Sequence, residues 1–162
     1  MVKEDSEKTK YPCSRLKGLK DFSAFAQEPG WKPAKINIAL FKKLDLAKGK
    51  EGEAVYALRF LGLIDSVGTP TTEFDQLKQK YKGTMNRLVQ EKYAELFSLL
   101  PPRMINQSRL VKYFGLPVET AEYQAKLLVW FCEQAGIDLP NVEPKFHRAR
   151  SDRKKKGVND KS

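Results

Sequence analysis

The chain has 162 residues, of which 41% are hydrophobic and 31% are charged. This length and composition predict one compact domain, or two small domains packed closely together, and they exclude a chain that is disordered throughout. The longest apolar run, residues 127–132, is far shorter than the roughly 20 residues of a membrane-spanning helix, so we expect no membrane span.

Two cysteines and a single histidine narrow the possible chemistry. Cys13 and Cys132 are far apart and form no CxxC motif, which favours free thiols in a cytoplasmic protein, and the first ten residues show no secretory signal. His147 lies in a basic segment, so a Ser–His–Asp or Cys–His site would have to use it, and a histidine-rich metal site is excluded. No nucleotide-binding glycine loop and no HExxH motif occurs. We therefore expect a non-enzymatic binding protein with no cofactor and no metal.

The first part of the chain has apolar residues at helical spacing. After a loose leader over residues 1–10, this spacing predicts a helix over residues 14–27 that ends at Pro29-Gly30. A second short helix is predicted over residues 36–44.

A turn and a third helix follow. The turn covers residues 46–50, and the helix begins near Glu51 and ends at Gly62. Residues 63–64 are β-like, and residues 65–71 predict a small hairpin or a loop. Helix, turn, helix and a wing-like loop in this order are typical of a winged helix-turn-helix.

Four more helices are predicted in the second half. A short one includes the apolar positions of residues 74–81, and a longer one covers residues 85–100 and stops at Pro101-Pro102. The last two helices are predicted over residues 106–114 and 118–135. The predicted fold class is therefore mainly α, with at most a small β-hairpin.

A weak internal repeat predicts two tandem units. LFKKLDL at residues 40–46 resembles LVKYFGL at residues 110–116, and each precedes a helix that ends in glycine and then an Ile-Asp pair. We expect a winged-helix-like unit over residues 11–82 and a second helix-turn-helix-like unit, packed on the first, over residues 83–144. Residues 145–162 form a basic arm without apolar periodicity, which predicts disorder.

The net charge of +10 is concentrated at the two ends of the chain. Residues 145–162 contain eight Lys or Arg and two acidic residues, and residues 1–20 contain six and three. The arm either contacts DNA phosphates without reading bases or serves only as a solubilising tail. Its candidate phosphate contacts are Lys145, Arg148, Arg150, Arg153, Lys154, Lys155 and Lys156.

The helix that begins near Glu51 is the candidate DNA-reading helix. Opposite its apolar stripe lie Glu53, Tyr56, Ala57 and Phe60, with Arg59 at the margin. Tyr56 and Arg59 are the candidate groove contacts. The basic residues just before this helix are candidate phosphate contacts: Lys42, Lys43, Lys48 and Lys50.

Two features of the same helix favour a protein partner instead. Glu51 and Glu53 at its start would repel phosphates, although acids there also complement the helix dipole. Phe60, opposite the core stripe, would pack on another surface together with Tyr56.

The helix over residues 118–135 is apolar around most of its circumference, which predicts a helix buried nearly all round. Its large side chains Leu127, Trp130 and Phe131 would fill either the core or a dimer seam.

Three segments resemble a known family. Tyr11-Pro12, LRFLGLIDSVGTPT at residues 58–71 and FCEQAGIDLP at residues 131–140 resemble, in this order and spacing, a family of uncharacterised prokaryotic proteins with a winged-helix-like fold, classed as a domain of unknown function. The resemblance covers residues 11–140. It implies that fold and an association with DNA-binding regulators, and it supplies no catalytic residue.

These observations predict a non-enzymatic DNA-binding protein of the winged-helix type, regulatory or accessory to DNA maintenance. It would be cytoplasmic and associated with the nucleoid. The alternative is a protein–protein adaptor or structural subunit whose winged-helix faces pack on a partner, including a second copy of the chain.

Overall fold

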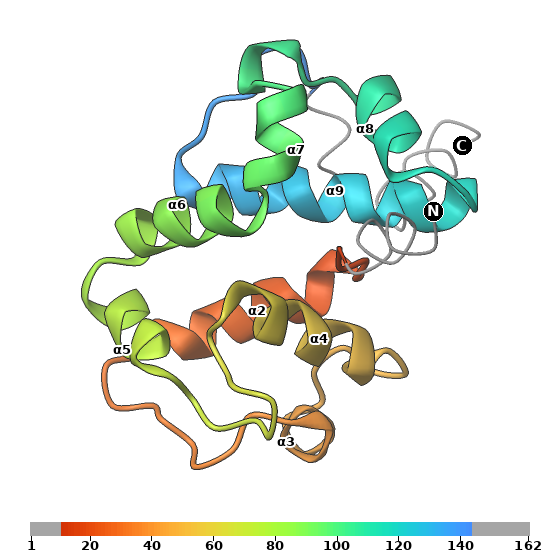
Figure 1. The fold of residues 1–162 in the computed structure, drawn as a ribbon. Helices are drawn as coiled ribbons and strands as arrows, with labels where there is room; N and C mark the ends of the chain where they lie inside the picture. Colours follow the sequence, from red (N-terminus) through yellow and green to blue (C-terminus); the bar gives the residue numbers. More distant parts are fainter. Residues whose placement is uncertain (1–10, 144–162) are drawn as a thin grey trace, which may run out of the picture.

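The computed structural model describes residues 11–143, and these residues form a mainly helical protein (Figure 1). The helices are α2 (Leu16–Ala26), α3 (Ile38–Lys43), α4 (Glu51–Leu61), α5 (Thr72–Gln79), α6 (Tyr81–Lys92), α7 (Ala94–Leu99), the 3-10 helix η1 (Pro102–Met104), α8 (Gln107–Phe114) and α9 (Val118–Ala135). The β pairing in this range is a single antiparallel bridge between Ile64 and Pro70. The predicted fold class is confirmed.

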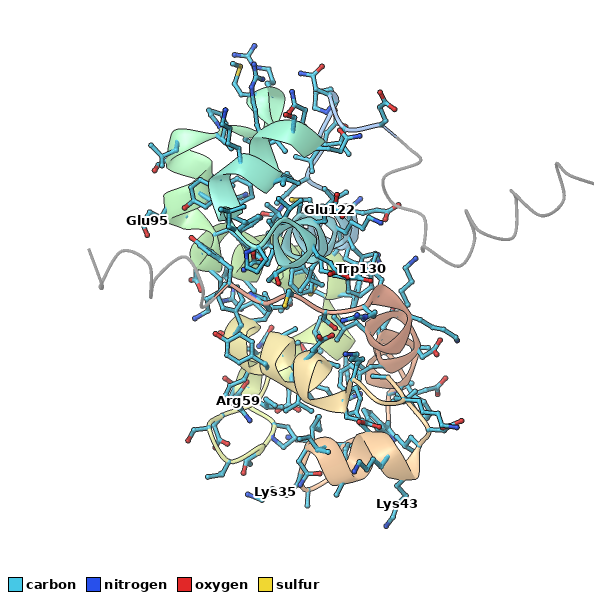
Figure 2. All side chains as sticks on the ribbon, turned by 90° about the vertical axis from the view of Figure 1, so that its right-hand side faces the viewer. Lys35, Lys43, Arg59, Glu95, Glu122 and Trp130 are labelled. Carbon is cyan, nitrogen blue, oxygen red and sulfur yellow. The ribbon has the colours of Figure 1, made fainter. Side chains whose placement is uncertain are left out.

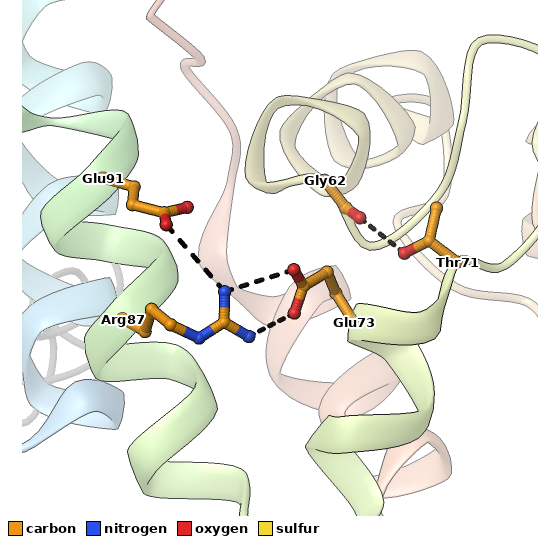
Figure 3. A network of polar contacts seen from close by, with 5 residues as sticks. All are labelled: Gly62, Thr71, Glu73, Arg87 and Glu91. Carbon is orange, nitrogen blue, oxygen red and sulfur yellow. Dashed lines mark hydrogen bonds and ion pairs between the residues drawn. The ribbon is translucent and has the colours of Figure 1, made fainter.

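Helices α2 to α5 form one group, the lower one in Figure 1. Helix α4 ends at Gly62, whose φ of 87° is a left-handed conformation that favours glycine, and the next residue closes the cap by donating from Leu63 N to the Leu58 carbonyl oxygen at 3.1 Å. The Thr71 hydroxyl then donates to the Gly62 carbonyl oxygen at 2.6 Å (Figure 3). These contacts attach the loop that carries the Ile64–Pro70 bridge to the end of α4.

Helices α6 to α9 form the upper group, in which α9 packs against α6 and α8. Most of the α9 circumference is buried, as the sequence predicted. Its buried residues are Ala121, Gln124, Ala125, Leu127, Leu128, Val129, Trp130, Phe131, Cys132 and Ala135.

The prediction of one long helix over residues 85–100 is wrong, because the chain forms two helices there. Tyr93 separates α6 from α7 with φ −108° and ψ 20°. Its ring is fully buried, stacked on Tyr11 at 5.2 Å between centroids and edge-on to Phe60 at 5.3 Å. Tyr81 also differs from the prediction, because it begins α6 instead of ending α5.

Tyr11 connects the two helix groups. Its ring contacts Phe60 of α4 at 5.8 Å and Phe114 of α8 at 5.6 Å between centroids. Its carbonyl oxygen accepts a hydrogen bond from Gln124 Nε2 of α9 at 3.0 Å. The segment before α2 is therefore packed into the interior between the groups.

An ion-pair network provides a second connection, between α5 and α6 (Figure 3). The Arg87 guanidinium donates to both carboxylate oxygens of Glu73, and Glu91 lies 4.0 Å from the same guanidinium. The hydrogen bond from Arg87 lowers the pKa of Glu73. The predicted unit boundary after residue 82 falls inside α6, and the division into two units stays a prediction.

The two helix–turn–helix segments, α3–α4 and α8–α9, begin with the same kind of helix cap and end with the same kind of helix stop. The Asn37 side chain accepts from Leu40 N at 3.0 Å, and the Asn106 side chain accepts from Arg109 N at 2.8 Å. Each asparagine therefore satisfies a free N–H at the start of its helix. The second helix of each pair ends on a left-handed glycine.

Candidate nucleic-acid interface

The turn between α3 and α4 has a tightly defined backbone. Asp45 and Ala47 have φ of 59° and 52°, in the left-handed region that residues with a Cβ rarely adopt. Lys50 N donates to the Ala47 carbonyl oxygen at 2.7 Å. Ala47 also packs closely on Gly18 of α2, where an added Cβ would lie 2.5 Å from the Ala47 Cβ. This packing fixes the backbone that carries Lys48 and Lys50.

The exposed side of α4 is narrow. Gly52, Tyr56 and Arg59 are exposed at helical spacing and form what we call the α4 stripe, with Tyr56 38% exposed. Tyr56 and Arg59 therefore lie on the solvent side, as predicted. Ala57 does not: it is completely buried, because the core covers more of this helix than the apolar stripe indicated.

The four predicted lysines lie at the end of α3 and in the turn before α4. Lys42 and Lys43 end α3, Lys48 and Lys50 end the turn, and all four are exposed. Among the ion pairs of residues 11–143, none involves these lysines. Figure 2 shows Lys43 projecting from the lower group of helices.

Both helix groups carry exposed residues of both charges. Lys35 and Arg59 lie with Lys43 on the lower group, whereas Glu95 and Glu122 lie on the upper group (Figure 2). The lower group contains α4, so the three labelled cations lie on the same helix group as the candidate helix.

The two acids at the start of α4 both have structural partners. Glu51 accepts from Gly49 N at 3.2 Å, and its pKa is lowered mainly by the hydrogen bond from its own backbone N–H, with a contribution from Lys42. Arg15 donates from Nη1 to both carboxylate oxygens of Glu53, at 2.9 and 3.2 Å. The charge of Glu53 is therefore offset by Arg15, whereas Glu51 stays an ionised carboxylate, so the helix start is less repulsive to phosphate at Glu53 only.

Of the predicted partner-packing residues, only Tyr56 is exposed. Phe60 is half-buried between Tyr11 and Tyr93. Leu127 and Phe131 are at most 1% exposed and Trp130 is 7% exposed within the single chain. Burial decides between the two alternatives for these three residues: they fill the core, not a dimer seam.

Three residues at this surface were missed. Lys35 is exposed and donates to the Thr69 hydroxyl at 2.9 Å. Ile38, 45% exposed, lies beside Gly52, and Arg15 neutralises Glu53. Lys35 had a signal, because it precedes the basic turn, whereas Arg15 is 38 residues from its partner and shares no local pattern with it. The predicted arm contacts, Lys145, Arg148, Arg150, Arg153, Lys154, Lys155 and Lys156, lie outside the described residues.

The described residues contain no group of three or more side chains placed to hold a metal ion, and no helix among them is long and apolar enough to cross a membrane.

Both cysteines are free thiols. Burial raises the pKa of Cys13 and raises the pKa of Cys132 to about 12, so both thiols are protonated at neutral pH.

Comparison with curated proteins and with solved structures returned no match. One family model matches residues 4–114, which includes two of the three resembling segments and ends before residues 131–140. The chain belongs to the family that this model describes, a family of unknown function designated DUF5343.

Proposed function

We propose that this protein binds double-stranded DNA without catalysing a reaction, as a winged-helix-type regulatory or DNA-maintenance factor that acts on the nucleoid in the cytoplasm. Helix α4 would enter the major groove with the α4 stripe, and the loop after Gly62 would serve as the wing. The lysines on either side of the turn would contact phosphates.

One observation carries the proposal: the exposed α4 stripe follows a run of lysines that form no ion pair among the described residues, and Glu53 at the helix start is paired with Arg15. Helix α9 lacks both features. Its large apolar side chains are buried, and its exposed acids Glu119 and Glu122 form no ion pair among the described residues. The chain therefore offers α4, and not its repeat counterpart, to an anionic partner.

The test is duplex-DNA binding by the full chain over a salt series. The site variant replaces Lys48, Lys50 and Arg59 with alanine. The control replaces Lys80, Lys112 and Arg109, which are exposed outside α3 and α4, so the residue types and the change in charge are the same. We expect the site variant to bind at least about tenfold more weakly in low salt and to lose about 2 in the slope of log affinity against log salt, at about 0.9 per phosphate contact. The control should show much less of both effects.

A third variant, with alanine at Arg153, Lys154, Lys155 and Lys156, measures the contribution of the arm. If this variant loses all affinity while the site variant binds like wild type, α4 does not dock on DNA and the proposal fails.

A protein–protein adaptor is the second candidate, favoured by an exposed apolar turn between α8 and α9. Leu116 is 84% exposed and Val118 is 50% exposed, beside an open hollow of about 640 Å³ that Val111 and Lys112 also line. DNA affinity that does not respond to the site variant would direct attention to this turn.

A further inference from the structure

Arg15 lies between α4 and α9, and the DNA-binding proposal assigns it no contact with DNA. Its guanidinium donates to both carboxylate oxygens of Glu53 on α4 and lies 4.3 Å from the centroid of the Tyr123 ring on α9. A guanidinium over an aromatic face is attracted by the ring. Arg15 is thus fixed by one helix of each group.

Glu53 is one of two acids in the first turn of α4, and of these two it is the one with an ion-pair partner among the described residues. It lies in the first turn of α4, next to Gly52 of the α4 stripe, and its side chain is still 27% exposed. An unpaired carboxylate there would face phosphates held by the neighbouring lysines. Like charges across an interface weaken binding.

The surroundings of Cys13 show how close these groups are. The charges of Glu53, Arg15 and Lys50 all act on the Cys13 thiol, whose pKa is raised mainly by burial. Lys50, a proposed phosphate contact, therefore lies in the same neighbourhood as the Arg15–Glu53 pair.

We propose that Arg15 is a positioning residue for DNA binding: it neutralises Glu53 beside the α4 stripe, and its stacking on Tyr123 holds it in place. This inference rests on the proposed function. Arg15 reduces the repulsion between Glu53 and a phosphate backbone only while the segment before α2 is packed between the two helix groups.

The test uses three variants of the full chain: Arg15→Met, Glu53→Gln and the double variant. Methionine keeps a long apolar side chain near Tyr123 and removes the charge. We expect Arg15→Met to weaken binding to duplex DNA about three- to tenfold at low salt, with the loss fading at high salt because the repulsion is screened. Glu53→Gln should bind at least as tightly as wild type, and the double variant should return to within about twofold of wild type.

Lys17→Met is the matched control, because it removes a cation from the same stretch of chain and frees the carboxylate of Asp21 on α2. It should leave DNA affinity unchanged. The melting temperature of each variant separates an electrostatic effect from a loss of fold, since a purely structural role for Arg15 would not be rescued by Glu53→Gln.

Two outcomes overturn the inference in different ways. If the site variant loses affinity but the double variant does not recover, Arg15 has no positioning role and the proposed function stands. If the site variant binds like wild type, both proposals fail together.

Discussion

The hydroxyl of Tyr93 has no hydrogen-bond partner among the described residues, although its side chain is completely buried. Burial raises the pKa of Tyr93 well above 10, so the group remains neutral at all ordinary pH values. A buried donor without a partner costs free energy. Tyr81 contrasts with it, because its half-buried hydroxyl donates to Gln134 Oε1 at 2.8 Å.

These two tyrosines give opposite predictions for the same substitution. We expect Tyr93→Phe to leave the free energy of unfolding unchanged or to raise it by about 1 kcal/mol, because it removes an unsatisfied hydroxyl and keeps the stacked ring. Tyr81→Phe should lower that free energy by about 1 kcal/mol by breaking a hydrogen bond. Denaturant titration of both variants measures the difference. A larger loss for Tyr93→Phe than for Tyr81→Phe would contradict the assignment of Tyr93 as unsatisfied.

Helix α2 packs closely on the turn before α4. A Cβ added at Gly18 would lie 2.5 Å from the Ala47 Cβ and 2.8 Å from the Ala47 Cα. Since Ala47 already has a left-handed backbone, the turn cannot move away easily. Gly83, which is likewise the third residue of its helix, has nothing within 4 Å of its added Cβ.

Alanine at these two glycines should therefore act in opposite directions. Gly18→Ala is expected to lower the free energy of unfolding by about 1–2 kcal/mol, the overpacking cost less the gain in helix propensity. Gly83→Ala should raise it by about 0.5–1 kcal/mol. Thermal and chemical unfolding of both variants tests this pair, and a stabilised Gly18→Ala protein would show that α2 and the turn can separate without cost.

Most helices could be predicted because their ends are determined locally. Gly62 and Gly136 end helices through their own left-handed conformation, and the apolar spacing of α4, α8 and α9 spans nearly the observed residues. The break at Tyr93 could not be predicted, because apolar residues continue at helical spacing on both sides of it. At the break the Tyr93 ring stacks on Tyr11, which is distant in the sequence.

The candidate site was predictable to the same extent and for the same reason. Helical spacing placed Tyr56 and Arg59 on the solvent side of α4, and the adjacent lysines were visible as a cluster. The interpretation of Glu53 as repulsive was incomplete, since its ion pair with Arg15 forms only when the chain folds back from a distant segment.

At the scale of the whole molecule, the ion pair of Glu73 with Arg87 joins the two helix groups, and the stability that it contributes depends on pH. Hydrogen bonding to Arg87 lowers the pKa of Glu73 below its ordinary value of 4.5. The unfolded chain then binds this proton more tightly than the folded chain does. The stability contributed by the pair is complete above about pH 4.5 and is lost as the pH falls through the lowered pKa of Glu73.

Comparison of wild type with Arg87→Met measures the contribution of the ion pairs that Arg87 forms with Glu73 and Glu91. We expect wild type to have the higher melting temperature at pH 6 and the difference to shrink at pH 3, because a larger fraction of Glu73 is protonated there. The difference should be small, because both side chains are partly exposed and solvent screens the pair. A difference that is equal at both pH values would show that Arg87 acts by packing alone.

The position of Tyr11 in the chain also determines when its tertiary contacts can form during synthesis. Its hydrogen-bond partner Gln124 follows it by 113 residues, so Tyr11 leaves the ribosome long before α9 exists. Until then the Tyr93 ring lacks its contact with Phe131 of α9, and Arg15 lacks the Tyr123 ring on which it stacks. Helix α4 can form early from local signals. The Arg15 guanidinium beside it reaches its final position only when nearly all of the described chain has been made.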